Sequence, residues 1–433
     1  MKTWIRRALG RVAFLRRIEP TFWFLHRSWK KRLPTFLEIL SVARAGRLRV
    51  NVLHPYATLA GREIGRIPSG NDISVALTRA PGAPVQSVQL RSSRILAIEA
   101  EGLVFEPQAE VISQSGRYFR QPLARRLGGR LDSENLYGAS SLIMWNSANI
   151  CLRATSPPQK QITIPEGILL NGQACNNWYH WLINILPKAF IAEKYLELSP
   201  KIPYLVSRSI QGTRMEEALR LVIGDDREVL FLEDGPHKVQ RGIVIEAPVR
   251  EVYRPKSILS PINWSDLGGF HYEIMTQYRS HTLARVKQAR LGLTAPTPGK
   301  IFLARDNLGR PYNQNEVGAL LEGIGFAPVR LEQLPFTEQV ALMAGATIVV
   351  GPTGAQWAGW LFTERAVGLI LVPRFLTRSS LFAKLGAAGS SELLELSMNS
   401  DDISWGQYLT TRAMATVDVS RLKQAVQLIV ERV

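Results

Sequence analysis

The sequence has little cysteine, no long apolar run and none of the common metal-binding or nucleophile motifs. Its 433 residues include only two cysteines, so a disulfide framework is not expected and a reducing compartment is the simpler interpretation. No apolar run reaches the roughly 18 residues that a transmembrane helix needs. Asp-x-Asp, Gly-x-Ser-x-Gly and Walker A patterns do not occur, and the six histidines are scattered. We therefore expect no metal site and no cofactor.

The composition is that of a globular protein with an uneven distribution of charge. Hydrophobic residues make up 46% of the chain and charged residues 21%, which excludes collagen and acidic disordered chains. The net charge is +17, of which +11 lies in residues 1–50. The rest of the chain is nearly balanced and has no zinc finger, no RNP-like aromatic motif and no basic-zipper heptads, so we expect no nucleic-acid partner.

The basic segment at residues 1–49 has the pattern of an amphipathic helix. At 100° per residue its apolar side chains fill one arc and most of its arginines the other; an aromatic cluster follows at 22–25. A signal peptide fits poorly because arginines interrupt any apolar core. We expect this segment to lie on an anionic membrane surface, which would make the protein peripheral on the cytoplasmic face of the plasma membrane. A solvated basic arm and a site for a partner protein are the alternatives.

The remainder divides into two units. Residues 50–160 are rich in Gly, Pro, Ser and short β-branched runs, which indicates β structure with long loops, including strands near 72–77 and 95–98. Strands and helices then alternate over 161–291, with an apolar helix predicted at 177–196. We expect Pro187 to kink this helix, because it removes the hydrogen bond to the carbonyl of Ile183. A Pro- and Gly-rich linker follows at 292–299, and alternation restarts over 300–433. We predict an α/β protein with two lobes and a ligand cleft between them.

A polar stripe marks the helix predicted at 177–196. Its members, spaced three and four residues apart, are Asn177, His180, Asn184 and Lys188. Most of the other positions are apolar, so the stripe must face a partner, a cavity or a ligand. His180 then suits the role of general base near neutral pH. The alternative is a hydrogen-bonded core histidine.

A glycine-containing turn follows the strand predicted at 347–350. It reads Gly351-Pro352-Thr353-Gly354-Ala355, and such a turn before a helix presents backbone N–H groups to phosphate. A tight turn without a ligand would use the same glycines. The glycine spacing is not the dinucleotide fingerprint and the next strand does not end in an acid, so a nicotinamide dehydrogenase is disfavoured.

Polar residues also follow the strand predicted at 300–305. Arg305 ends it, Arg310 and Asn315 come soon after, and an arginine there suits a phosphate or carboxylate. A surface ion pair with Asp306 is the alternative. Glu338 opens the helix before the glycine turn, where it either complements the helix dipole or contacts a ligand.

In this order, these motifs resemble glycosyltransferase family 61, the capsular-polysaccharide type. The matching segments are Asn177 to Pro187, Ala304-Arg305, Asn315-Glu316, Phe336 to Gln339 and Gly351 to Ala355. The resemblance implies a GT-B-like fold with two Rossmann-like lobes, the acceptor at the N-terminal lobe and a nucleotide-sugar at the C-terminal lobe. It implies inverting transfer, without an obligatory metal, to a hydroxyl of a glycan or lipid-linked acceptor in the synthesis of a bacterial capsule, exopolysaccharide or lipopolysaccharide.

The resemblance also assigns roles to residues. His180 would be the base or position the acceptor, while Arg305 and the amides of Gly351–Ala355 would bind the diphosphate. Glu338 and Asn315 would contact the sugar or ribose. The chain departs from the family pattern at Thr353, where His is usual, and at Asn184, where an acid is common. Neither can act as acid or base near neutral pH, which favours the alternative of a non-catalytic member that binds nucleotide or glycan as an assembly subunit.

Overall fold

The computed structural model describes most of the chain beyond residue 47. The described ranges are 48–77, 86–121, 145–146, 150–154, 162–172, 174–249, 269–289, 298–306, 311–373, 379–399 and 414–433. The predicted basic segment and most of the linker predicted at 292–299 lie outside them. Within these ranges, no helix combines the length and the apolar character that crossing a membrane requires.

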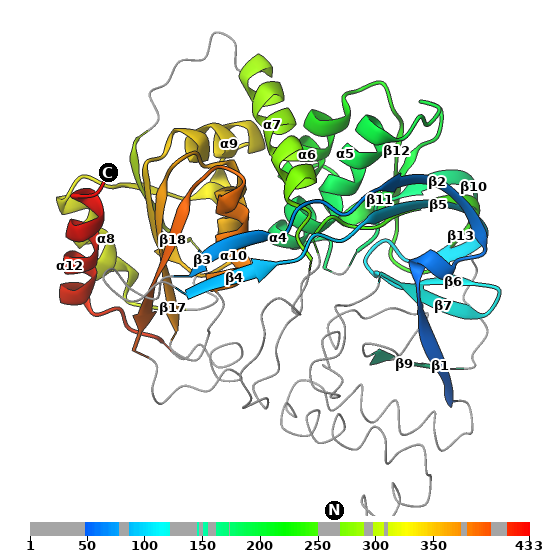
Figure 1. The fold of residues 1–433 in the computed structure, drawn as a ribbon, viewed down its shortest axis with the longest axis horizontal. Coiled ribbons are helices and arrows are strands. Elements are labelled where there is room, and N and C mark those ends of the chain that lie inside the picture. The colour runs from blue at the N-terminus through cyan, green and yellow to red at the C-terminus, as the bar shows by residue number, and fades with distance from the viewer. Residues whose placement is uncertain are drawn as a thin grey trace, which may run out of the picture.

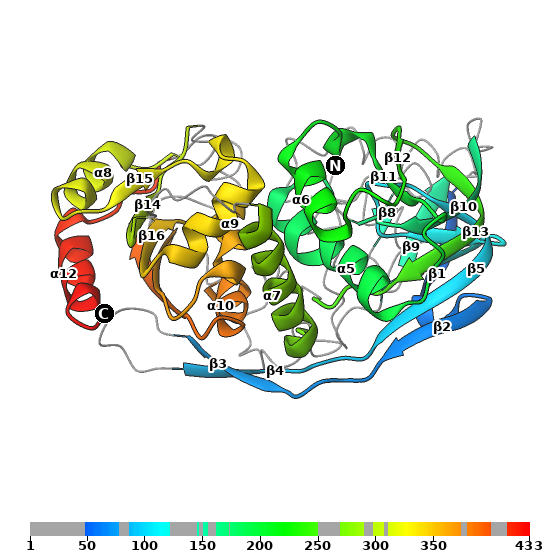
Figure 2. The same cartoon turned by 90° about the horizontal axis from the view of Figure 1, so that it is seen from above.

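The fold is mixed α/β, as the sequence predicts, and it is built on two sheets that lie side by side (Figures 1 and 2). The strands of the first sheet are β1 (Leu48–Pro55), β2 (Gly61–Ile67), β5 (Ile95–Phe105), β6 (Ile112–Gln114), β7 (Arg117–Arg120), β8 (Trp145–Asn146), β9 (Ile150–Ala154), β10 (Ile162–Leu169), β11 (Tyr204–Ser207), β12 (Val229–Leu232) and β13 (His237–Ile245). Their order is β12-β11-β10-β13-β5-β6-β7-β1-β9-β8, with β2 also paired to β5.

The pairing in the first sheet changes from parallel to antiparallel at β13. Strands β12, β11, β10 and β13 run parallel, and Ile168 is in register with both Tyr204 and Ile243. β13 then pairs antiparallel with β5, which begins the β-rich part of the sheet. The helices of this unit are α4 (Trp178–His180), α5 (Leu186–Tyr195), α6 (Arg214–Ile223) and α7 (Tyr272–Ala289). Short 3₁₀ turns occupy Tyr56–Thr58 and Arg208–Ile210. The parallel strands carry the α/β half that the sequence predicts.

The helix predicted at 177–196 is interrupted just before Pro187, the residue at which a kink is predicted. A π-helical turn, η3 (Trp181–Ile185), separates α4 from α5, and the amide of Leu186 donates to the carbonyl of Trp181. Pro187 has no N–H for the carbonyl of Ile183, so a regular helix would leave that carbonyl unpaired. The wider turn places Pro187 in the first turn of α5, where no donor is needed. The extra residue in the turn also shifts the phase of α5 relative to α4.

The second sheet is entirely parallel. Its strands are β14 (Lys300–Leu303), β15 (Ala327–Val329), β16 (Ile348–Pro352), β17 (Val367–Pro373) and β18 (Glu392–Met398). They lie in the order β15-β14-β16-β17-β18. Its helices are α8 (Gln314–Gly323), α9 (Phe336–Gly345), α10 (Ser379–Ala387) and α12 (Val419–Val430), with 3₁₀ helices η6 (Leu331–Gln333) and η7 (Ala355–Phe362). All seven residues of β17 are buried, as expected of a strand covered on both faces.

A hairpin from the N-terminal half of the chain reaches the second unit. Strands β3 (Ile73–Leu77) and β4 (Gln86–Leu90) pair with each other outside both sheets. Figure 2 shows them running along the molecule from β2 toward the C-terminal half. β3 packs against α10 and β18, and Val75 is buried there. The two units are therefore joined by this hairpin as well as by the chain after α7.

The two units also pack tightly through their helices. The Trp178 ring meets Phe336 edge-on at 5.6 Å between ring centroids. Glu217 of α6 accepts hydrogen bonds from the amides of Phe336 at 2.8 Å and Thr337 at 3.2 Å. These amides belong to the first turn of α9, whose donors have no partner within the helix. A carboxylate from one unit thus caps a helix of the other, where the helix dipole also favours negative charge.

Replacing Glu217 with Ala should lower the free energy of unfolding by about 1–2 kcal/mol, because two helix amides lose their acceptor. Glu217→Gln keeps an amide oxygen and should lose about half as much. Urea unfolding monitored by circular dichroism measures both, with the exposed Glu322→Ala on α8 as the surface control. Equal stability of the Glu217 and Glu322 alanine variants would contradict this role.

Candidate functional site

The second sheet places two of the predicted motifs at one edge. Numbered along the chain, its strand order is 2-1-3-4-5, so the connections diverge between β14 and β16. Ligands of open parallel sheets bind in the crevice outside the carboxyl ends of such neighbouring strands. Arg305 follows β14, and Gly351 to Gly354 end β16 and begin the turn after it. The topology therefore brings Arg305 and the glycine turn to the position where a ligand is expected.

Arg305 lies directly against the glycine turn. Its Nη2 donates to the carbonyls of Pro352, at 3.3 Å, and Thr353. The Gln314 side chain holds the Arg305 main chain from both sides, accepting from its amide at 3.0 Å and donating to its carbonyl at 2.9 Å. A Cβ on Gly354 would lie 2.0 Å from Arg305 Nη2. The backbone of Gly354 is extended, so a side chain there would displace the end of the Arg305 side chain and not the backbone.

The amides of the turn are not equivalent. Pro352 has none, and the amide of the buried Thr353 donates to the carbonyl of Leu371 at 2.9 Å. Gly351 lies within β16, in register with Ile370 of β17. The amides of Gly354 and Ala355, at the start of η7, therefore remain as the candidates for binding an anion. The five predicted residues of this turn supply two such groups rather than five.

His180 and Asn184 form a pair. His180 Nδ1 lies 3.0 Å from Asn184 Oδ1, and Asn184 Nδ2 donates to the carbonyl of Val249 at 3.2 Å. Because the amide nitrogen is used as a donor, Oδ1 is the acceptor and Nδ1 carries the proton. A neutral His180 then has its lone pair on Nε2. Asn177 is the exposed residue before α4, and its Oδ1 accepts from the Tyr179 amide at 3.0 Å.

The helix of His180 lies beside the helix that follows the glycine turn. α4 packs against η7, and Phe382 of α10 contacts both. The Phe382 ring lies 5.5 Å from that of Tyr179 and 6.5 Å from that of Trp357. The two predicted motifs, one from each unit, therefore share an aromatic contact at the junction of the units.

Lys188 does not extend the polar stripe of His180. It is 3% exposed, as residues 186–192 of α5 are all buried, and its Nζ donates to the carbonyl of Asn171 at 2.9 Å. Asn171 follows β10 and donates from Nδ2 to the carbonyl of Ala109 at 2.8 Å. The segment after β5 thus fills the end of β10 in the first sheet. Burial lowers the pKa of the Lys188 ammonium to about 8.

The remaining predicted residues are more dispersed. Glu338 is exposed on the first turn of α9 and Asn315 is exposed on α8. Within the described ranges, neither side chain forms a hydrogen bond with Arg305 or His180. Arg310 lies outside the described residues. Among the described residues, no three His, Cys, Asp or Glu side chains are grouped as a metal site would need.

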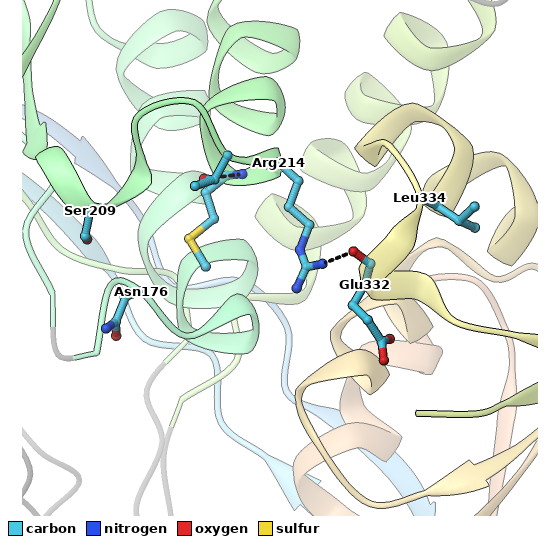
Figure 3. A pocket seen from close by; sticks show the side chains of 7 residues that line it. Asn176, Ser209, Arg214, Glu332 and Leu334 are labelled. Carbon is cyan, nitrogen blue, oxygen red and sulfur yellow. Dashed lines mark hydrogen bonds between the residues drawn. The ribbon is translucent and has the colours of Figure 1, made fainter. Parts of the chain in front are cut away.

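A pocket that the sequence does not reveal lies where the two units meet (Figure 3). Its volume is about 350 Å³, and its lining comes from both units: Asn176, Ser209, Thr213, Arg214 and Met215 from the first, Glu332 and Leu334 from the second. These residues form no sequence motif. Only the loop positions of Asn176 and Ser209, and the place of Thr213 and Arg214 at the start of a predicted helix, could have pointed to them.

Arg214 and Glu332 connect this pocket to the crevice. Arg214 Nη1 donates to the Glu332 carbonyl at 2.9 Å, and its guanidinium lies 5.0 Å from the centre of the Trp178 ring. Burial lowers the pKa of Arg214. The Glu332 carboxylate accepts from the amide of Asp306 at 3.1 Å, next to Arg305. The pocket and the crevice are therefore neighbours at the carboxyl end of β14.

Residues 178–370 match the family Glycosyltransferase 61. The matched region begins at α4 and ends within β17, so it contains the His180 pair, Arg305, the glycine turn, Arg214 and Glu332. The match agrees with the family resemblance seen in the sequence motifs and supports glycosyltransferase activity. No curated protein matches the chain.

The buried Lys188 should leave a signature in the pH dependence of stability. Its pKa is about 8 in the folded protein against 10.5 for an unperturbed lysine. Between these values the unfolded chain holds more protons, so stability rises with pH, by about 3 kcal/mol from this group. Lys188→Met should remove that rise. Urea unfolding at about pH 7.5 and pH 10 measures it.

The matched control is Lys194→Met, because Lys194 lies exposed on the same helix. This variant should keep the pH dependence of the wild type. If Lys188→Met and Lys194→Met respond alike to pH, Lys188 does not carry the effect.

Proposed function

We propose that the protein is an inverting glycosyltransferase of GT-B-like architecture, with Rossmann-like lobes, that transfers a sugar from a nucleotide-sugar to a hydroxyl. The observation that carries the proposal is the contact of Arg305 with the glycine turn at the divergence of β14 and β16, inside the region that matches Glycosyltransferase 61. A guanidinium beside two helix-start amides is suited to a diphosphate. The second unit then binds the donor and the first unit the acceptor.

The chemistry follows from the two motifs at the junction. His180 Nε2 takes the proton of the acceptor hydroxyl as its oxygen attacks the anomeric carbon of the donor sugar. The bond from that carbon to the diphosphate breaks on the opposite face, which inverts the configuration. Arg305 and the amides of Gly354 and Ala355 stabilise the negative charge on the departing nucleoside diphosphate. These residues complete the transfer without an obligatory metal in this proposal.

The acceptor is a glycan or a lipid-linked glycan in the synthesis of a bacterial capsule, exopolysaccharide or lipopolysaccharide. Residues 1–49 hold the protein on the cytoplasmic face of the plasma membrane, where such an acceptor is presented. The net charge of +11 in residues 1–50 supports this placement, since each Lys or Arg near an anionic leaflet contributes about 1 kcal/mol of attraction.

A second candidate function is binding of nucleotide or glycan without turnover, as an assembly subunit. Asn184 favours it, because an amide fixes the tautomer of His180 but cannot stabilise the imidazolium as a carboxylate would. Thr353 also favours it, since its side chain is buried and its amide is used by the sheet.

Calorimetric titration with UDP, GDP and CMP, with and without EDTA, tests the donor site. One nucleotide should bind with micromolar affinity that EDTA leaves unchanged. Arg305→Ala should weaken this binding by about tenfold or more, because a charge-assisted contact to phosphate is lost. Arg62→Ala, at an exposed position on β2, is the control. Failure of all three nucleotides to bind would remove the transferase proposal.

His180→Ala separates catalysis from binding. It should reduce turnover by 100-fold or more, a range of about 10²–10⁴ being typical for a general base, and leave nucleotide affinity within about twofold. Sugar transfer with the donor identified by calorimetry measures the rate, and His54→Ala on β1 is the control. Nucleotide binding with no turnover in the wild-type protein would favour the assembly subunit, and an undiminished rate in His180→Ala would refute the role of the base.

A further inference from the structure

Arg305 lies just beyond the residues of β14 that pair with neighbouring strands. The amide of Ala304 still donates to the carbonyl of Val329, the last residue of β15, at 2.9 Å. The main chain of Arg305 pairs with a side chain instead, because Gln314 Oε1 accepts from its amide at 3.0 Å and Nε2 donates to its carbonyl at 2.9 Å. Opposed residues of antiparallel strands exchange two hydrogen bonds in the same way. Gln314 therefore takes the place of a strand at the residue that carries the guanidinium.

The residue before Gln314 makes the same kind of pairing with another part of the chain. Asn313 Oδ1 accepts from the amide of Val417 at 2.8 Å, and Nδ2 donates to the carbonyl of Val417 at 3.0 Å. An asparagine directly before a helix usually caps that helix, but the Asn313 side chain does not cap α8. Val417 lies just ahead of α12, which packs against α8 (Figures 1 and 2). Two consecutive amide side chains thus join the main chain of Arg305 to the chain ahead of α12.

The segment ahead of α12, residues 415–417, is itself fixed to the second unit. The amide of Ala415 donates to the carbonyl of Pro311 at 3.2 Å. Thr416 exchanges two hydrogen bonds with Asn399, the residue after β18, at 2.7 and 3.0 Å. This segment therefore connects the end of an outer strand of the sheet to the start of α8, and Asn313 is paired with a main chain that is held on both sides.

We infer that Asn313 and Gln314 form a clamp that positions Arg305 for the diphosphate of the donor, and that the segment 415–417 supports the donor site through this clamp. The inference rests on the proposed transferase function and adds two positioning residues to it. Neither side chain contacts the substrate; both act through Arg305.

The contacts of Arg305 give the physical reason for such a clamp. Its guanidinium donates to the carbonyls of Pro352 and Thr353, and its main chain is bound by Gln314. A long side chain that is fixed at both ends loses little conformational freedom when a phosphate binds. Binding groups must also be held within about 0.5 Å of their productive position. Loss of the clamp should therefore displace the guanidinium from the phosphate, an effect that is distinct from a loss of stability.

A double-mutant cycle with Arg305 separates positioning from stability. The full-length protein is titrated calorimetrically with UDP, GDP and CMP, as wild type and as Gln314→Met, which keeps the length of the side chain but removes its hydrogen bonds. Gln314→Met should weaken binding of the preferred nucleotide by about tenfold. In the Arg305→Ala background the same substitution should change the affinity by less than about twofold, because Gln314 acts only through Arg305. Asn313→Ala should show the same dependence on Arg305, with a loss of about threefold.

The matched control is Gln424→Met, at an exposed position of α12, which should leave the affinity unchanged. Circular dichroism and urea unfolding show whether each variant folds, and if Gln314→Met does not, Asn313→Ala decides by the same comparison. Equal losses with and without Arg305, or unchanged affinity in a folded clamp variant, overturn the inference and leave the transferase proposal in place. Absence of nucleotide binding by the wild type removes the proposed function and this inference together.

Discussion

The close contact of Arg305 with Gly354 is the constraint on which the second unit depends. It joins the turn after β16 to an arginine at the end of β14, and the guanidinium occupies the space that a side chain at position 354 would enter. The double hydrogen bond from Gln314 holds the Arg305 main chain, and Trp357 Nε1 donates to the Pro352 carbonyl at 3.0 Å. The positive group and the turn are thereby fixed before any ligand arrives, which lowers the entropy cost of binding.

The edge at which the strand connections diverge has different surroundings in the two sheets. In the first sheet the parallel strands run β12-β11-β10-β13, so the connections also diverge between β10 and β13. There the chain after β5 bonds to Asn171 at the end of β10, and Lys188 is enclosed beside it. In the second sheet the corresponding edge carries Arg305 and borders a pocket. One edge therefore contributes stability and the other contributes the candidate donor site.

The contacts that join the two units involve the same elements that carry or border the candidate site. The Glu217 cap and the Trp178–Phe336 contact fix α9 and α4, and the same elements border the pocket and support His180. Arg214 takes part in both, since it stacks on Trp178 and bonds to the Glu332 carbonyl. The candidate site residues of the two units are thus held in place by contacts between protein groups.

The sequence by itself determined the α/β class, most strands and helices of residues 161–372, and the motifs around His180, Arg305 and the glycine turn. These features depend on local periodicity and on neighbouring residues, which a single chain displays directly. The burial of Lys188 depends on tertiary packing, because residues 186–192 are enclosed on every side of α5 by other parts of the chain. The tertiary structure alone decided that Arg214 meets Glu332, since no local pattern encodes contacts between residues more than 100 positions apart. The order of strands in a sheet is likewise set by packing of the whole chain, and that order places the site.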